Sequence, residues 1–177
     1  MATATETIQG TYVLDPIHSS ASFAVKHMVV STFRGRFEKF DATLVDGKLT
    51  GTVDVSSIVV KDENLAAHLQ SPEFFDAERH PELRFESSDI RRGEGDEIVV
   101  DGELTIKGIT KAVEARGTLE GPAVTFGDVN KVGLTLEAII DRTEFGLNWN
   151  APLPKGGLVL GNDVTLVVAL ELVKAEA

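Results

Sequence analysis

The sequence has 177 residues, a length that suits one domain, and no low-complexity or Pro/Ser-rich segment divides it. Hydrophobic residues make up 42% and charged residues 25%, which supports a packed core and excludes a disordered chain. The formal net charge of −11 opposes nucleic-acid binding, because no long basic run offsets the repulsion of phosphate backbones.

The absence of cysteine excludes disulfides, thiolate metal sites and cysteine nucleophiles. Residues 1–9 predict a flexible N-terminus that lacks the basic and apolar regions of a secretory signal. No run approaches the ~20 apolar residues that span a bilayer. We therefore expect a soluble, cytoplasmic protein without stable membrane insertion.

Alternation of apolar and polar side chains with period two predicts β-strands from the beginning of the chain. The first four strands are expected at residues 11–15, 20–30, 35–45 and 49–60. Asp46-Gly47 lies between apolar runs and is a strong hairpin signal.

One segment, residues 62–75, interrupts this alternation. Leu65, His68 and Leu69 follow helical spacing before Ser71-Pro72 ends the run. We predict a short helix in a long connection. Because so short a helix is unstable alone, its apolar side must pack on the rest of the domain.

The second half returns to alternation, and five more strands are expected at residues 83–90, 97–107, 111–120, 131–141 and 162–173. Gly108-Ile109-Thr110 supplies a turn between two of them. Such strands, each with one apolar face, must close into a barrel or stack as two sheets. Their length favours an all-β antiparallel barrel, since long open edges are costly.

No motif in the chain predicts catalysis, a metal site or a bound cofactor. The four histidines, at positions 18, 27, 68 and 80, lack the spacing of metal ligands. Asp15, His18 and Ser19 lack the strained elbow of a nucleophilic serine. The glycine pairs, Gly93 with Gly95 and Gly156 with Gly157, do not match the motif of a phosphate-binding loop. Their presence is explained by the need for glycine in turns.

Phenylalanine is the most informative residue type, because seven of its members concentrate around the first hairpins and the helix, at positions 23, 33, 37, 40, 74, 75 and 85. This pattern fits either a dense core or the lining of a ligand site. A barrel of eight strands is either filled by side chains or holds one small ligand, so strand number leaves both open.

Several ordered motifs resemble the YceI-like family over nearly the whole chain. They are LDPIHSSASFAVKH (14–27), GRF (35–37), HLQSPEFFD (68–76), HPELRFES (80–87), GELTIKGITK (102–111) and DRTEFG (141–146). The resemblance implies a lipocalin-like, eight-stranded antiparallel barrel. It also implies a non-enzymatic protein that carries or sequesters a polyisoprenoid, such as a polyprenyl phosphate or an isoprenoid quinone, or another lipid chain, in an apolar tunnel.

Combined with the alternation, the resemblance predicts which residues contact the ligand. The expected lining is Phe23, Val25, Phe37, Phe74, Phe75, Phe85, Leu104, Ile106, Val113, Leu134, Leu136, Trp149, Leu166 and Val168. Candidates for contact with the head group are His27, Arg34, Arg36 and Arg142. Homodimerisation through strand edges or an apolar rim is compatible with the resemblance.

Two departures from the family pattern bear on the ligand. An Arg-Asp pair usual before the helical histidine is replaced by Leu65-Ala66, and a proline usual after the Thr-Lys turn is replaced by Ala112. Two alternative functions stay open. One is an enzyme for an apolar substrate, with His27 or His68 paired to Asp15 or Asp141. The other is a ligand-free, stress-associated interaction module.

Overall fold

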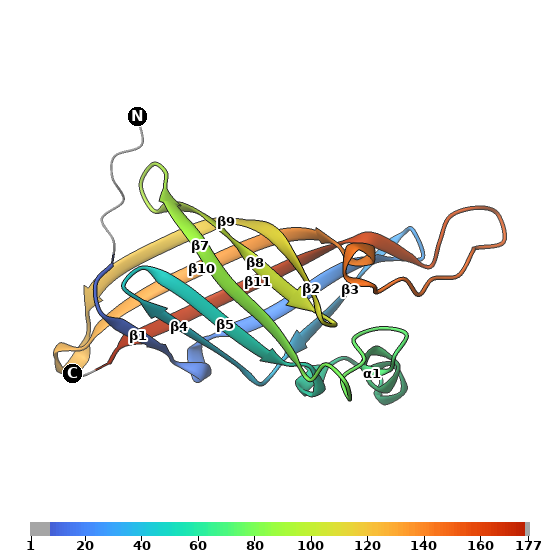
Figure 1. Ribbon diagram of the computed structural model, residues 1–177, viewed down its shortest axis with the longest axis horizontal. Helices are drawn as coiled ribbons and strands as arrows, with labels where there is room; N and C mark the ends of the chain where they lie inside the picture. Colours follow the sequence, from blue (N-terminus) through green and yellow to red (C-terminus); the bar gives the residue numbers. More distant parts are fainter. Residues whose placement is uncertain (1–7, 176–177) are drawn as a thin grey trace.

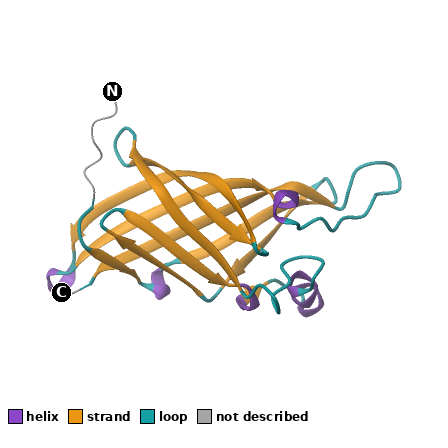
Figure 2. Ribbon diagram, in the orientation of Figure 1, coloured by secondary structure: helices purple, strands orange, loops and turns teal. Residues whose placement is uncertain are grey.

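The computed structural model describes residues 8–175, so most of the expected N-terminal tail, residues 1–7, lies outside the described residues. The described chain forms one elongated barrel with a short helix at one end (Figure 1, Figure 2). The strands are β1 (Thr11–Leu14), β2 (Ser20–His27), β3 (Ser31–Phe37), β4 (Phe40–Val45), β5 (Lys48–Asp54), β6 (Ile58–Val59), β7 (Glu82–Arg92), β8 (Glu97–Ile106), β9 (Ile109–Val124), β10 (Asn130–Asp141) and β11 (Leu160–Lys174). The helices are α1 (Glu63–Gln70) and the 3₁₀ turns η1 (Pro16–His18), η2 (Val55–Ser57), η3 (Phe126–Asp128) and η4 (Arg142–Phe145).

Eight strands close the barrel in the order β1, β4, β5, β7, β8, β9, β10 and β11, and β11 pairs back to β1. All of these pairings are antiparallel. The predicted eight-stranded antiparallel barrel is therefore confirmed. At one end β2 continues alongside β11, and β3 and β6 extend the sheet beyond the ring.

The chain bends where a single strand over 35–45 was expected, and that expectation is wrong. β3 ends at Phe37 and β4 begins at Phe40. Between them Glu38 N donates to Ser57 O at 3.2 Å and Lys39 N donates to Ser57 Oγ at 2.9 Å. These hydrogen bonds to η2 take the place of bonds between neighbouring strands. The chain can therefore bend here, so that β3 pairs with β2 while β4 pairs with β1.

Three other expected boundaries also change. The strand expected over 49–60 is divided into β5, η2 and β6, and the strand expected over 20–30 ends at His27. The turn between β8 and β9 is Lys107-Gly108, with φ of 52° and 76°, rather than residues 108–110. Two-residue turns of this kind match the twist of the strands they join.

The predicted helix is confirmed as α1. The Asp62 side chain accepts a hydrogen bond from Leu65 N at 3.0 Å, which caps the first turn. The helix stops at Ser71, next to Pro72, as the sequence indicated. Among the described residues, no helix is long and apolar enough to cross a bilayer.

The barrel interior is filled at one end and hollow at the other. At the end that holds β1 (Figure 1), Val132 and Leu172 are fully buried, and Ile8 packs against the same cluster. At the α1 end the interior cluster is largely aromatic, with Phe23, Phe37 and Phe74. The two halves of the barrel thus have different packing, and the hollow half holds the candidate site.

Candidate functional site: a two-chamber apolar cavity

Two adjoining cavities occupy the hollow half of the barrel. The one nearer α1, here the outer chamber, has a volume of about 200 Å³. The second, here the inner chamber, has a volume of about 160 Å³ and extends toward the filled end. Phe37, Leu83 and Leu166 line both chambers, so these three side chains form the boundary between them.

The structure places thirteen of the fourteen predicted lining residues in the chamber walls, and their contact with a ligand stays a prediction. The outer chamber is lined by Phe23, Val25, Phe37, Phe74, Phe75, Ile106, Trp149 and Leu166. The inner chamber is lined by Phe37, Phe85, Leu104, Val113, Leu136, Leu166 and Val168. Leu134 lines neither chamber because it is buried in the cluster that fills the other end.

Several wall residues were missed by sequence reasoning. Val164 and Ile140 share the inward face of predicted strands, so alternation could have identified them. Leu147 and Val159 belong to the connection between η4 and β11, where no periodicity marks them. Leu65 also lines the outer chamber, so the departure from the family's Arg-Asp pair makes this wall apolar.

Two glycines make room for aromatic rings in the wall. The Phe23 ring lies over Gly35 of the neighbouring strand, so that a Cβ added at Gly35 would sit 2.5 Å from Phe23 Cζ. Phe85 lies over Gly102 in the same way, with a distance of 2.6 Å. Because no side chain lies beneath them, both rings can lie against the barrel wall.

We expect Gly35→Ala to push the Phe23 ring into the outer chamber. The shift should lower the free energy of unfolding by about 1–2 kcal/mol, because the ring must leave its packed position. It should also weaken binding of any ligand that fills the chamber. Urea unfolding and ligand titration measure the two effects. Gly133→Ala is the control, since Gly133 lines neither chamber and its Cβ would approach only Glu120 Cβ and Oε2, both at 3.9 Å. Unchanged affinity together with lost stability would place the ligand away from Phe23.

Arg142 is the one arginine or lysine among the described residues that line the outer chamber, and it is only 4% exposed. Its Nε donates to Gly161 O at 2.8 Å, and its Nη1 donates to Leu147 O at 2.6 Å and Trp149 O at 2.9 Å. The guanidinium therefore ties both ends of the connection between η4 and β11 to the barrel. Burial lowers the pKa of Arg142, and the nearby Asp141 carboxylate partly offsets this.

One nitrogen atom of this guanidinium makes no hydrogen bond. Nη2 is buried and has no hydrogen-bond partner, and no described carboxylate forms an ion pair with Arg142. A buried donor without a partner costs about 1–3 kcal/mol. An acceptor atom on a bound molecule would remove that cost.

Of the other three candidates for contact with the head group, one lines the outer chamber and two lie on the outside of the barrel. His27 lines the outer chamber at the end of β2. Arg34 and Arg36 alternate with the inward residues of β3 and are exposed, so they do not line either chamber. Arg36 instead lies 3.5 Å from the Glu38 carboxylate.

The histidine and aspartate pairs of the enzyme hypothesis do not form among the described residues. His68 also lines the outer chamber, but its Nε2 lies 3.1 Å from Glu73 Oε2 and its ring is edge-on to Trp149. Asp15 is bonded to His18, and Asp141 accepts from Thr143 N and Thr143 Oγ1. The Thr143 bonds lower the pKa of Asp141, which keeps it an acceptor that caps η4.

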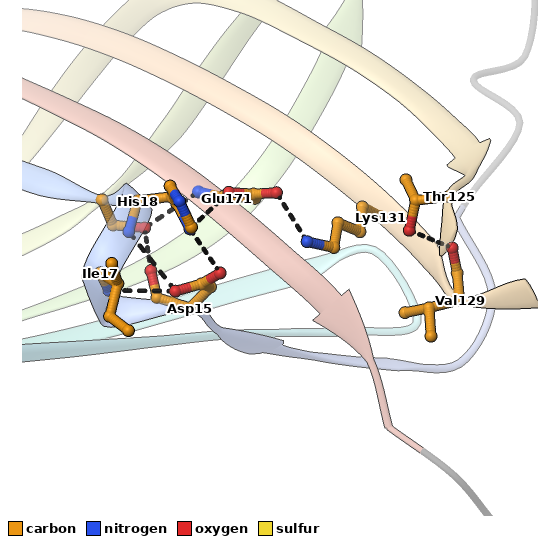
Figure 3. A network of polar contacts seen from close by, with 8 residues as sticks. Asp15, Ile17, His18, Thr125, Val129, Lys131 and Glu171 are labelled. Atoms are coloured by element: carbon orange, nitrogen blue, oxygen red, sulfur yellow. Dashed lines mark hydrogen bonds and ion pairs between the residues drawn. The ribbon is translucent and has the colours of Figure 1, made fainter. Parts of the chain in front are cut away.

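A separate polar network lies at the filled end of the barrel (Figure 3). His18 Nδ1 lies 2.9 Å from Asp15 Oδ2 and 3.4 Å from Glu171 Oε2. Lys131 Nζ lies 2.9 Å from Glu171 Oε1. Asp15, His18 and Glu171 are close enough to offer three metal ligands, but the Lys131 ammonium already neutralises Glu171. We therefore assign the network a structural role: it is a joint of ion pairs and hydrogen bonds that holds η1 against β10 and β11.

This joint should make stability depend on pH. The hydrogen bond to Asp15 raises the pKa of His18, whose ordinary value is 6.5, while Glu171 adds to the rise and Lys131 opposes it. The His18 contribution is therefore complete below pH 6.5 and is lost as the pH rises through the raised pKa. The same bond lowers the pKa of Asp15 below 3.8, so the Asp15 contribution is present above pH 3.8 and is lost in acid.

We expect His18→Gln to flatten the loss of stability on the alkaline side. Urea midpoints of wild type and variant, measured from mildly acidic to mildly alkaline pH, check this. Two parallel curves would show that the network does not titrate as described.

The comparisons with known proteins agree with this geometry. The sequence pattern of the YceI-like domain matches residues 12–172, which is nearly the whole barrel. The chain belongs to the YceI-like family. A UPF0312 protein of Staphylococcus aureus (strain N315) is 34% identical over 173 residues, covering 90% of this chain and 95% of the relative.

Solved structures with this YceI-like fold include BcnA of Burkholderia cenocepacia, with a TM-score of 0.72 and 23% identity over 89% of this chain and 98% of that one. A YceI protein of Campylobacter jejuni has a TM-score of 0.74 and 23% identity, covering 85% and 90% of the two chains. A polyisoprenoid binding domain from Saccharophagus degradans, implicated in plant cell wall breakdown, has a TM-score of 0.71 and 12% identity over 93% and 98%. At these identities the likeness establishes the fold.

Proposed function

We propose that this protein binds one long apolar chain, of the isoprenoid class, in the two chambers and carries or sequesters it. The observation that carries the proposal is the cavity itself: it lies inside the barrel, its wall is almost wholly apolar, and the opposite end is filled. Apolar cavities of this kind stay dry and take up apolar molecules. The fold shared with a polyisoprenoid binding domain supports the same ligand class.

The chamber volumes indicate how much of a chain can enter. A dry cavity of about 150 Å³ holds one benzene molecule. With volumes of about 200 and 160 Å³, the two chambers therefore take roughly a dozen carbons, or two to three isoprene units. A longer isoprenoid requires Phe37, Leu83 and Leu166 to move apart, or leaves its remaining length outside.

The energy of such binding comes from buried carbons. Roughly a dozen carbons at about 0.8 kcal/mol each contribute about 10 kcal/mol. Association costs at least about 4 kcal/mol, which leaves an affinity of roughly tens of micromolar. We infer that the tail enters first and that tighter binding requires either a longer buried segment or a contact with the head group.

Arg142 and His27 are the residues we assign to such a contact. Both line the outer chamber, and Arg142 has the unpartnered Nη2. A phosphate oxygen of a polyprenyl phosphate or a carbonyl oxygen of an isoprenoid quinone would serve as acceptor. The apolar chain provides most of the energy, and the acceptor orients the ligand.

Native mass spectrometry of gently purified protein tests the proposal. We expect an added mass that organic extraction removes and that tandem mass spectrometry identifies as a prenyl chain. Refolded protein should lack this mass and should regain it on incubation with a prenyl alcohol. If neither gently purified nor refolded protein takes up an apolar chain, the proposal fails.

Two further expectations are predictions with their own tests. Sedimentation velocity decides whether the protein is a homodimer, and fractionation of the source cells decides whether it is cytoplasmic.

A further inference from the structure

Two exposed loops meet at the hollow end of the barrel. The turn between β2 and β3 contains Met28, Val29 and Val30. Met28 N donates a hydrogen bond of 2.8 Å to the carbonyl oxygen of Val159, which lies in the loop that precedes β11. The loop before β11 projects from this end (Figure 1), and its Gly157 packs beside Val29. Val30 is 85% exposed, Val29 59%, Leu158 47% and Met28 41%. We call Met28, Val29, Val30 and Leu158 the apolar tip.

The backbone conformation of the turn disfavours the residues that occupy it. Met28 and Val29 have φ of 53° and 67°, a region that glycine and asparagine adopt readily and that β-branched residues rarely adopt. An Asn-Gly turn would satisfy the backbone and would expose no apolar surface. Two large apolar side chains are therefore present despite both backbone strain and solvent exposure, and such strain is found at functional positions.

The charge around the apolar tip differs from that of the whole chain. The two segments that build it, residues 16–37 and 145–162, contain none of the 28 acidic residues of this chain of net charge −11. Lys26, Arg34 and Lys155 on these segments are exposed. Acidic residues resume with Glu38 and Asp163, and the acidic connection that holds α1 lies on the other side of this end (Figure 1).

We propose that the apolar tip docks on the surface of an anionic lipid bilayer. Apolar side chains at a loop tip gain free energy when they enter the boundary between head groups and acyl chains, and flanking cations are attracted to anionic lipids. Acids more than one Debye length away, about 8 Å at physiological ionic strength, oppose this attraction only weakly. His27, which directly precedes the turn, and Val159 of the loop before β11 line the outer chamber, so docking places the cavity next to the bilayer.

This inference goes beyond the proposed function, which it uses only to explain why the cavity would approach a membrane. Sedimentation with sucrose-loaded vesicles tests it, using phosphatidylcholine with or without phosphatidylglycerol. We expect the protein to sediment with the anionic vesicles and to stay in solution with pure phosphatidylcholine. Met28→Asn with Val29→Gly should reduce partitioning roughly tenfold or more, because it removes two apolar anchors. The Tm of this variant should be unchanged or higher, since the turn strain is relieved.

Matched variants separate docking from folding and from the cavity. Val30→Ser with Leu158→Ser should also lower partitioning, whereas Phe126→Ser, at a fully exposed position in the turn at the opposite end of the barrel, should not. A variant with a blocked inner chamber should still bind vesicles. Docking is overturned if wild type fails to bind anionic vesicles, if it binds neutral vesicles equally, or if the tip variants bind as wild type does. None of these outcomes affects chain binding measured without vesicles.

Discussion

Replacing Ala138 with tryptophan is expected to reduce the affinity for long prenyl chains roughly a few thousandfold. Ala138 lines the inner chamber opposite Leu166 of β11, and an indole there would occupy most of the 160 Å³. About six carbons of the chain would lose their place, which costs about 5 kcal/mol at about 0.8 kcal/mol per carbon. A titration series of prenyl alcohols from geraniol to geranylgeraniol measures the effect.

The length of the chain provides the internal control for Ala138→Trp. Short alcohols that fit the outer chamber should bind the variant as they bind wild type, whereas the gain with each further isoprene unit should vanish. Glu137→Trp adds the same side chain at the neighbouring exposed position and should leave the series unchanged. Overpacking should cost about 1–3 kcal/mol of stability, which a folded barrel tolerates. If wild type and variant show the same length dependence, the chain does not enter the inner chamber.

Replacing Arg142 with alanine is expected to lower the free energy of unfolding by about 3–5 kcal/mol, because three backbone carbonyl acceptors lose their donor. These carbonyls belong to Leu147, Trp149 and Gly161. The connection between η4 and β11, which forms part of the outer chamber, should become mobile. Urea unfolding measures the loss of stability, and hydrogen exchange over residues 146–160 measures the loosening.

Arg142→Lys separates the two roles of the guanidinium. Lysine keeps the charge but cannot reproduce the planar fork that reaches several acceptors at once. We expect this variant to lose most of the same stability while keeping a preference for anionic over neutral prenyl ligands. Full stability in Arg142→Ala would contradict the anchoring role. If wild type bound a prenyl hydrocarbon without a head group as tightly as a prenyl phosphate or an isoprenoid quinone, the assigned head-group contact would be contradicted.

The fold could be predicted largely from periodicity. Alternation depends on one face being buried, and that condition holds over most of β8 and β10, whereas both ends of β9 are exposed. The bend between β3 and β4 could not be predicted, because it depends on hydrogen bonds to Ser57, about twenty residues later in the chain. The alternation of residues 35–45 cannot indicate a hydrogen-bond partner so far along the chain.

The site shows a different limit. Alternation identifies which side chains point inward but not how far along the barrel each lies. Leu134 and Leu136 share one face of β10, yet Leu134 belongs to the filled end and Leu136 lines the inner chamber. Arg142 was named from a motif, but its burial and its three backbone acceptors arise only when η4 and β11 meet.

A crystal structure of unrefolded protein incubated with geranylgeraniol tests the central claim most directly. The proposal predicts continuous density for a prenyl chain that begins in the outer chamber, passes between Phe37, Leu83 and Leu166, and ends in the inner chamber. The hydroxyl end should lie toward Arg142 and His27. Chambers that are empty or closed by side chains at saturating ligand, or density only on the outer surface, would contradict it.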